Sequence, residues 1–360
     1  IKGSDQPVAA RRLLGFPDRD HPVAVAASAL VGRRWEMAAV EGLLQRAIEG
    51  HGAVVTVVGS PGIGKSRLVR EVAALASARG VEMFSAHCES HTTQVPFHTV
   101  GRLLRSATGI EHLDAQQARM RLRELDSEAD PDDIVLFEDL MGIRDPEVEL
   151  PKIDPDARRR RLTALVNTAS LARESPAVYV IEDAHWIDEV SESMLADFFT
   201  VIPQTPSLVL VTYRPEYRGL LSHVGGSPSI ALAPLSDFEI ATLLGELIGG
   251  EPSVSDLAAL IVERAAGNPF FAQEMVRELA ERGTLQGQLG GYVSTADVAT
   301  VSLPATVQAL AEDGPAQMLV SLDLNGCTLL ARITRKSATA LQLRPGLHVY
   351  AQVKGAAVLD

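Results

Sequence analysis

Short runs of apolar, mostly β-branched residues alternate with amphipathic segments through the first two thirds of the chain. These runs predict buried strands over 53–58, 81–88, 177–183 and 207–214, with a weaker strand over 229–234. The segments between them carry apolar residues at helical spacing. Strands that alternate with helices predict an α/β fold, in which a doubly wound parallel sheet is covered by helices on both faces.

The same pattern predicts where the helices of this sheet-containing region lie. One helix is expected over 30–50, and a second from about 66 to 78. Residues 96–170 are mostly helical, and an acidic stretch over 126–133 is expected to interrupt them as a loop.

The pattern becomes wholly helical over 236–282, where Ser236 is the expected N-cap of the first helix. We interpret this segment as a small helical lid. A β-hairpin around Gly290–Gly291 is expected within 284–295, because paired glycines between strand-like residues indicate a tight turn.

Short strands return near the C-terminus and predict a small β segment. They cover 318–324, 328–334 and 347–358, and the turns Asn325–Gly326 and Pro345–Gly346 separate them. An Asn-Gly turn between two apolar runs is a strong hairpin signal.

The chain is therefore expected to have four parts. They are a linker over 1–28, an α/β core over 29–235, a helical lid with its hairpin over 236–309, and a β segment over 314–360. Because the first residue is Ile1 rather than methionine, we expect a processed form or a fragment.

A glycine-rich motif joins the first predicted strand to the helix that follows it. GSPGIGKS (59–66) matches the phosphate-binding pattern GxxxxGK[ST] in the strand–loop–helix context that this motif requires. Lys65 is expected to reach the β- and γ-phosphates, and the Ser66 hydroxyl to coordinate Mg²⁺. The alternative is a glycine-rich turn that binds nothing. The expected nucleotide-binding residues here are Gly59, Ser60, Pro61, Gly62, Ile63, Gly64, Lys65, Ser66 and Arg67.

Two carboxylates end the third predicted strand. A phosphate site of this kind needs a carboxylate at the end of a neighbouring strand to hold Mg²⁺, and a second carboxylate can polarise the attacking water. Glu182 and Asp183 can each take either role, and their order weakly favours Glu182 for the metal and Asp183 for the water. The alternative is an ordinary charged strand terminus.

Further residues beside these carboxylates have two interpretations each. His185 can sense the γ-phosphate or make a structural hydrogen bond, while Trp186 is expected to pack. Arg214, at the end of the next strand, can contact the γ-phosphate or form a surface ion pair.

Composition narrows the class of partners. The 360 residues carry a net charge of −13, which argues against a broad nucleic-acid-binding face. The arginine run over 158–161 is expected to be a solvated helix face. Cys88 and Cys327 are no disulfide framework, and no apolar run is long enough to span a membrane, so a cytoplasmic location is expected.

Several motifs together resemble the STAND branch of AAA-like P-loop ATPases, as found in bacterial multidomain regulators. The similarity covers about 29–309, and such modules occur behind class III cyclase domains and in large transcription regulators. It implies a nucleotide switch whose partners are other domains or subunits of a signalling protein. It also implies that Val31 touches adenine and that Pro269 lies near it. The motifs are LVGRRWEM, GSPGIGKSRLVREV, CESHTTQVPFHTVGRLLR, IEDAHWID, AGNPFFAQEMVREL and SLPATVQAL.

The two ends of the chain resemble other families. Residues 1–16 are similar to the tail that follows a class III cyclase domain, but the cyclase domain itself is absent, so no cyclase activity is expected. Residues 314–358 resemble the C-terminal half of a TOBE domain, the oxyanion-binding module of molybdate-importer ATPases. Ser337 and Lys354 match positions that line the oxyanion site. The favoured interpretation is that Ser337 caps a helix and Lys354 is a solvated strand end.

We therefore expect a P-loop ATPase core that binds Mg-ATP or Mg-ADP and acts as a slowly hydrolysing switch, since no arginine finger is evident. The alternative is the ATPase subunit of a molybdate-type ABC importer, suggested by the TOBE-like tail. That alternative requires an LSGGQ-like signature, and the sequence has none. A binding module that has lost hydrolysis is a third interpretation.

Overall fold

The computed structural model describes residues 30–125, 130–224, 226–295, 306–312, 317–324, 327–347 and 349. The predicted linker over 1–28, with its cyclase-like tail, lies outside these residues. The chain forms two compact units. The first holds Leu30–Ile240 with Ala265–Phe270, and the second includes Ala241–Arg264 and the chain from Phe271 onward.

A parallel sheet of 5 strands in the order β2-β3-β4-β1-β5 forms the centre of the first unit. All the strands predicted for this region are confirmed, and so is the α/β fold class. The strands are β1 (Ala53–Val58), β2 (Glu82–His87), β3 (Ala177–Glu182), β4 (Ser207–Tyr213) and β5 (Ser229–Ala231).

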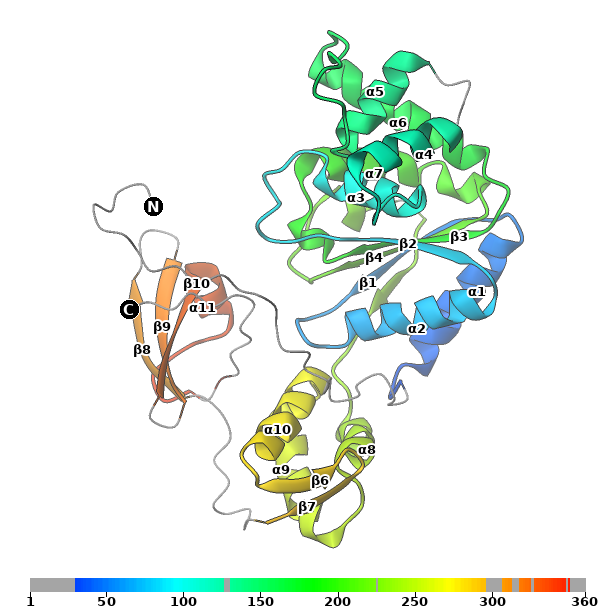
Figure 1. Ribbon diagram of the computed structural model, residues 1–360. Coiled ribbons are helices and arrows are strands. Elements are labelled where there is room, and N and C mark those ends of the chain that lie inside the picture. The colour runs from blue at the N-terminus through cyan, green and yellow to red at the C-terminus, as the bar shows by residue number, and fades with distance from the viewer. Residues whose placement is uncertain are drawn as a thin grey trace. The chain divides into compact units, whose positions relative to one another are not determined.

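Helices cover both faces of this sheet (Figure 1). Helices α1 (Arg34–Ile48) and α2 (Lys65–Ala78) pack on one face, where their Leu44 and Leu68 join Val55 in one apolar core. The neighbouring Val54 points the other way, into a second core. This alternation is what a strand buried on both faces requires.

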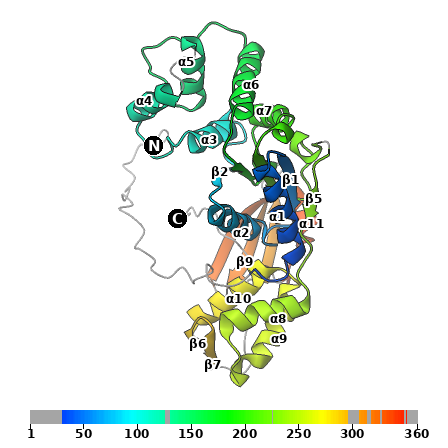
Figure 2. The ribbon, with the colours of Figure 1, turned by 90° about the vertical axis from the view of Figure 1, so that its right-hand side faces the viewer.

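The second face is covered by α3 (His98–Ala107), α6 (Pro155–Leu171) and α7 (Glu189–Phe199). Figure 2 shows these helices and α1 and α2 on opposite sides of the sheet. Two further helices, α4 (Ala115–Leu125) and α5 (Pro131–Leu140), extend this helical layer.

The acidic loop predicted over 126–133 is wrong for its second half. Pro131 is the first residue of α5, and the Asp130 side chain caps the helix by accepting a hydrogen bond from the Asp132 backbone N–H at 2.8 Å. An Asp N-cap followed by Pro at the first helical position is a helix-start signal that the high acidity of this stretch obscured. Residues 126–129 lie outside the described residues.

The arginine run on α6 is largely engaged by carboxylates of neighbouring helices. Arg158 pairs with Asp139, Arg159 contacts Asp197 at 3.2 Å, and Arg161 pairs with Asp133. Three of the four arginines are thus half-buried in ion pairs, so the run is less solvated than expected.

The helical segment after the sheet contains α8 (Asp237–Ile248), α9 (Ser255–Ala265) and α10 (Pro269–Glu281). Ser236 is confirmed at the start of α8. Its hydroxyl accepts from the Glu239 N–H at 3.3 Å, and the Glu239 carboxylate accepts from the Ser236 N–H at 2.7 Å, which is a capping box. The predicted hairpin is also confirmed, as β6 (Leu285–Gln288) and β7 (Gly291–Ser294).

An antiparallel sheet of 3 strands, in the order β10-β9-β8, follows near the C-terminus. Strands β9 (Gln317–Leu324) and β10 (Cys327–Thr334) were predicted, whereas β8 (Thr306–Glu312) was not. The predicted turn Asn325–Gly326 and most of the predicted strand over 347–358 lie outside the described residues.

The predicted capping role of Ser337 is wrong. The short helix α11 (Arg335–Ala340) begins two residues before Ser337, and its N-cap is Thr334. The Thr334 hydroxyl oxygen accepts a hydrogen bond from the Ser337 N–H at 3.0 Å. Ser337 therefore lies in the first turn of α11. Lys354, the other candidate oxyanion ligand, lies outside the described residues.

None of the helices within the described ranges combines the length and the apolar character needed to cross a membrane.

Candidate nucleotide-binding site

The phosphate-binding motif forms a tight loop between β1 and α2. The loop starts where the Gly59 N–H donates to the Tyr213 carbonyl at 3.2 Å, and it ends at Gly64, the residue before α2. Gly62 and Gly64 have φ values of +77° and +109°, which L side chains rarely adopt. Around the position of a β-carbon on Gly64 there is open space, whereas one on Gly62 would lie 2.9 Å from the Asn268 Oδ1.

Positive charge is concentrated at the phosphate loop. No side chain caps the N-terminus of α2, so its first N–H groups and the helix dipole favour an anion there. Lys65 is 8% exposed, and its Nζ donates to the carbonyls of Gly59 at 2.8 Å and Ser60 at 3.1 Å. A glycine cradle with a buried ammonium fits a nucleotide phosphate.

The other motif residues follow in the first turn of α2. Ser66 is exposed, and Arg67 forms an ion pair with Glu71 at 2.5 Å. The buried Ile63 fills the core beneath the loop. Ser66 is thus a surface residue at the start of α2, and its metal-binding role stays a prediction.

Two side chains from distant parts of the sequence hold this loop in place. Arg33 is 6% exposed, and its guanidinium donates to the carbonyls of Ile63 at 3.3 Å and Ala233 at 2.7 Å. The Asn268 side chain donates to the Pro61 carbonyl at 3.0 Å. Neither residue was predicted as part of the site, because a contact between such distant positions has no local pattern.

The motifs that contain these two residues were nevertheless recognised. Val31, the expected adenine contact, is half-buried in the turn before α1, close in sequence to Arg33. Pro269, the other expected adenine neighbour, is the first residue of α10 and directly follows Asn268. Arg33 and Asn268, which lie close in sequence to the expected adenine contacts, are thus the residues that bond to the loop.

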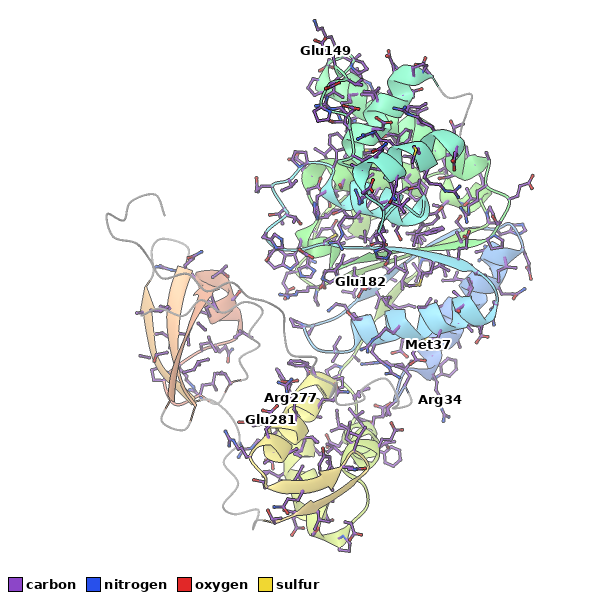
Figure 3. The ribbon with its side chains drawn as sticks, viewed as in Figure 1. Arg34, Met37, Glu149, Glu182, Arg277 and Glu281 are labelled. Carbon is purple, nitrogen blue, oxygen red and sulfur yellow. The ribbon has the colours of Figure 1, made fainter. Side chains whose placement is uncertain are left out.

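The two predicted carboxylates lie at the same edge of the sheet as the phosphate loop, because the carboxyl ends of parallel strands share an edge. Glu182 is the half-buried last residue of β3. It is labelled in Figure 3. The expectation that these carboxylates end a strand adjacent to β1 is wrong, since β4 lies between β1 and β3. A carboxylate on β3 therefore reaches toward the loop across the end of β4.

Asp183 has an unusual backbone conformation. Its φ of 54° and ψ of 42° are left-handed, which is uncommon for residues other than glycine. Its N–H donates to the hydroxyl oxygen of Thr212, a buried residue on β4, at 3.0 Å. This bond ties the turn after β3 to the strand beside it. Strained backbone of this kind clusters at functional sites.

His185 follows in a short 3₁₀ turn, Ala184–Trp186, and its ring is mostly buried. Neither ring nitrogen has a hydrogen-bond partner among the described residues, so the structural hydrogen bond considered for His185 is not found there. Burial, followed by the positive charge of Arg214, lowers the pKa of His185 to about 4. His185 is therefore neutral at pH 7, and can donate one hydrogen bond and accept another.

Lys65 and Asp183 also act on His185. The Asp183 carboxylate raises the pKa of the histidine and the Lys65 ammonium lowers it, although both effects are smaller than burial. Charged residues of the phosphate loop, of the turn after β3 and of the end of β4 therefore all act on the pKa of this one histidine. Arg214 lies with its guanidinium carbon 5.9 Å from the centre of the Trp186 ring. No ion pair to Arg214 is found within the described ranges.

A buried aspartate connects the acidic segment to α3. Asp188 is 2% exposed, and it accepts hydrogen bonds from the backbone N–H groups of Phe97 at 2.9 Å, Thr99 at 3.3 Å and Ser191 at 2.9 Å. It both caps α7 and anchors the start of α3. This residue closes the IEDAHWID motif, and its role is structural.

Replacing Asp188 with alanine is expected to lower the free energy of unfolding by about 3 kcal/mol, since buried N–H groups would lose a charged acceptor. The measurement is chemical denaturation followed by circular dichroism. Glu189→Ala is the matched control, because Glu189 is the exposed next residue of the same helix. Equal destabilisation by the two substitutions would contradict this role.

Metal binding at this site would depend on the nucleotide. Among the described residues, no group of three or more His, Cys, Asp or Glu side chains is placed to hold a metal ion alone. A P-loop site holds Mg²⁺ between the nucleotide phosphates, a hydroxyl and a carboxylate. The exposed Ser66 and the half-buried Glu182 are side chains of these types.

Comparison with protein families gives three matches. Residues 29–211 match the model of an AAA ATPase domain. Residues 301–359 match a TOBE domain, and residues 236–286 match a domain of unknown function. Of the three resemblances drawn from the sequence, those to an AAA-like ATPase and to a TOBE domain are confirmed.

Curated relatives match different parts of the chain. An uncharacterized protein of Rhizobium meliloti (strain 1021) is 28% identical over 247 residues, which are 66% of this chain and 24% of that protein. The molybdenum import ATP-binding protein ModC of Albidiferax ferrireducens is 60% identical over 57 residues, which are 16% of this chain and 15% of that protein. ModC of Thiobacillus denitrificans is 28% identical over 335 residues, 85% of this chain and 91% of that protein. The chain therefore spans a quarter or less of the first two relatives.

Among solved structures, Cdc6p from Pyrobaculum aerophilum is similar with a TM-score of 0.43 and 14% identity, over 73% of this chain and 65% of that chain.

Proposed function

The chain belongs to the AAA ATPase domain family, and on that premise we propose that it is a nucleotide switch of a bacterial signalling or transcription-regulatory protein. In this proposal it binds Mg-ATP, hydrolyses it slowly, and passes the nucleotide state to other domains or subunits. The observation that carries the proposal is the buried Lys65 in its glycine cradle, at the sheet edge that also presents Glu182 and Asp183.

Each residue of the site has a role in this proposal. The backbone of Gly59–Gly64 surrounds the phosphates, and Lys65 neutralises the β- and γ-phosphate charge. Ser66 and Glu182 would hold Mg²⁺, which would supply positive charge beside the phosphates when bound. Asp183 accepts a proton from the attacking water.

The surrounding residues complete the proposed site. Neutral His185 would donate a hydrogen bond to the γ-phosphate or to the attacking water after a movement that uncovers one of its two buried ring nitrogens. Arg214 contributes positive charge, while Val31 and Pro269 contact adenine. Arg67 lies beside the loop, where Glu71 neutralises its charge.

The switch proposal is supported by contacts between the phosphate loop and the residues that lead into α10. Asn268 donates to the Pro61 carbonyl, and the Phe270 N–H donates to the Gly62 carbonyl at 3.4 Å. A side chain on Gly62 would collide with both residues, so the contact is close. A loop that changes shape when the γ-phosphate is lost would therefore strain or release the start of α10.

We expect the amide of Phe270 to exchange with deuterium at least about threefold more slowly with Mg-ATP than with Mg-ADP, because the γ-phosphate rigidifies the loop that accepts its hydrogen bond. Hydrogen exchange measured by mass spectrometry tests this prediction. The amide of Val55, in the buried β1, is the internal control. Identical exchange in the two nucleotide states would contradict the switch while leaving nucleotide binding intact.

Slow hydrolysis is supported by the absence of a recognisable arginine finger in the sequence and by the position of Arg214 over Trp186. We expect turnover on the order of 10⁻² s⁻¹ or slower, as in NTPases that lack an activating partner. Phosphate release by the purified chain measures this rate. Turnover of about 1 s⁻¹ or faster would contradict the proposal.

A second candidate function is the ATPase subunit of a molybdate-type importer. The TOBE match and the relatives named ModC favour it. In that proposal Ser337 and Lys354 contribute to an oxyanion site. It is the weaker candidate, because the sequence has no LSGGQ-like signature with which to complete a dimeric site.

A further inference from the structure

The segment that follows β4 begins with a tight turn, and this turn carries Arg214. The Tyr217 N–H donates to the Arg214 carbonyl at 3.0 Å, which closes a four-residue β-turn. Pro215 occupies the second position of the turn, where its fixed φ favours this conformation. The turn therefore determines how Arg214 leaves the end of β4, at the sheet edge that also presents Asp183.

Tyr217 is held from two sides. The centre of its ring lies 5.0 Å from the centre of the Tyr213 ring, at the buried end of β4, and its hydroxyl donates a hydrogen bond to the Glu192 carboxylate. Burial and this hydrogen bond both raise the pKa of Tyr217, so the hydroxyl keeps its proton at neutral pH and remains a donor. Hydrogen bonds to a charged acceptor are stronger than those between neutral groups. The far end of the turn is therefore fixed to Glu192, a residue of α7.

The same carboxylate oxygen has a second donor from this segment. The Leu220 N–H donates to the Glu192 Oε1 at 2.8 Å. Gly219 lies between the two donors, and an added β-carbon there would collide with this oxygen and lie 2.5 Å from the Tyr217 hydroxyl oxygen. Two donors from the stretch Tyr217–Leu220 thus converge on a single oxygen of Glu192, and the backbone between them packs closely against it.

Helix α7 also anchors the turn that follows β3. Asp188, the N-cap of α7, comes shortly after Asp183 in the sequence, and Glu192 lies one helical turn further along. The turn with Asp183 and the turn with Arg214 are therefore both fixed to the start of one helix. The centre of the Trp186 ring, which belongs to the first of these turns, lies 5.9 Å from the Arg214 guanidinium carbon, so the two turns are close in space.

We propose that Glu192 is a positioning residue for Arg214, because it holds the turn after β4 and thereby keeps the arginine in place at the edge of the nucleotide site. This role rests on the proposed function, in which Arg214 contributes positive charge to the site. Glu192 has no assigned contact with nucleotide, and it acts through the turn that it fastens. Loss of its carboxylate releases two donors at once, so the turn can shift and take Arg214 with it.

The test is a double-mutant cycle on the full chain with Glu192→Ala and Arg214→Ala, measured as single-turnover release of phosphate from Mg-ATP. Glu192→Ala is expected to slow hydrolysis about 10- to 100-fold, the cost of a displacement of about 1 Å, and Arg214→Ala at least as much. Calorimetry is expected to show that both variants still bind Mg-ATP. The double variant is expected to be no slower than Arg214→Ala alone, because Glu192 acts through Arg214, whereas a merely structural role predicts that the two losses add.

Two further variants serve as controls. Glu192→Gln keeps an oxygen that can accept from Tyr217 and Leu220, and is expected to hydrolyse ATP within about threefold of the parent rate, since a hydrogen bond to a neutral acceptor is about half as strong. Glu189→Gln removes an exposed carboxylate from the same helix and is expected to leave hydrolysis unchanged. If Glu192→Ala does not fold, Tyr217→Phe replaces it in the cycle, because it removes one of the two donors.

The results distinguish the positioning role from the proposed function. Parental hydrolysis by Glu192→Ala or by Arg214→Ala, or additive losses in the double variant, would overturn the positioning role, while hydrolysis by the parent chain would leave the proposed function intact. A loss in Glu192→Gln as large as that in Glu192→Ala would assign the effect to the charge of Glu192 and would also overturn the role. No hydrolysis by the folded parent chain would contradict the proposed function, and the positioning role with it.

Discussion

Replacing Lys65 with alanine is expected to lower Mg-ATP affinity by about 2–5 kcal/mol, and to lower hydrolysis to background. The substitution removes a buried cation that bonds to the carbonyls of Gly59 and Ser60, so the loop would lose both its positive charge and an internal brace. Removing one member of a buried charge pair typically costs this much. Calorimetry with Mg-ATP and phosphate release measure the two effects.

The matched control for Lys65→Ala is Lys152→Ala. Lys152 is exposed and lies outside the glycine loop, so its removal changes net charge by the same amount without touching the proposed site. An affinity change shared by both substitutions would indicate a general charge effect. Retention of full affinity by Lys65→Ala would contradict the assignment of this loop.

Replacing Asp183 with asparagine is expected to slow hydrolysis by about 10²- to 10⁴-fold while Mg-ATP binding persists, because the amide cannot accept the proton of the attacking water. Asparagine is chosen for a structural reason. Asp183 has a φ of 54°, and asparagine tolerates the left-handed region better than most residues. The N–H bond to Thr212 should therefore survive the substitution.

Single-turnover phosphate release and calorimetry separate the two parts of this prediction. Glu189→Gln is the control, since it removes a nearby exposed carboxylate that no proposed step uses. Unchanged hydrolysis in Asp183→Asn would remove Asp183 from the mechanism. Loss of nucleotide binding as well would assign Asp183 to the metal, and would reverse the roles proposed for Asp183 and Glu182.

The sheet and the phosphate loop were predictable because their signals are local. The run AVVTVV is β-branched and has no polar interruption beyond one threonine, so β1 matches its predicted bounds of 53–58. The loop that follows is determined by glycines at positions of positive φ. The Ser236 capping box is likewise contained within four consecutive residues.

The secondary-structure predictions were wrong where a second local signal outweighed the first, or where a contact distant in sequence determined the structure. Acidity at 126–133 suggested a loop, but an Asp N-cap and Pro131 start α5 there. The helix assigned to Ser337 begins two residues earlier, because Thr334 provides the capping hydroxyl. Strand β8 pairs with β9, whereas the pattern of its own residues did not predict a strand.

The same distinction holds for the candidate site. Lys65, Glu182 and Asp183 were found from motifs, whereas Arg33 and Asn268 bond to carbonyls of the loop that lie 30 and 207 positions away in sequence. The position of β4 between β1 and β3 was not predictable either, because strand order is set by how the crossover helices pack.

A calorimetric titration of nucleotide-free chain with ATP, in the presence and absence of Mg²⁺, tests whether the glycine loop binds nucleotide. Nucleotide is first removed by unfolding and refolding, and its absence is checked in a denatured sample. We expect saturable binding of one ATP per chain, and we expect Mg²⁺ to strengthen it. No heat of binding from a folded, nucleotide-free chain would contradict it.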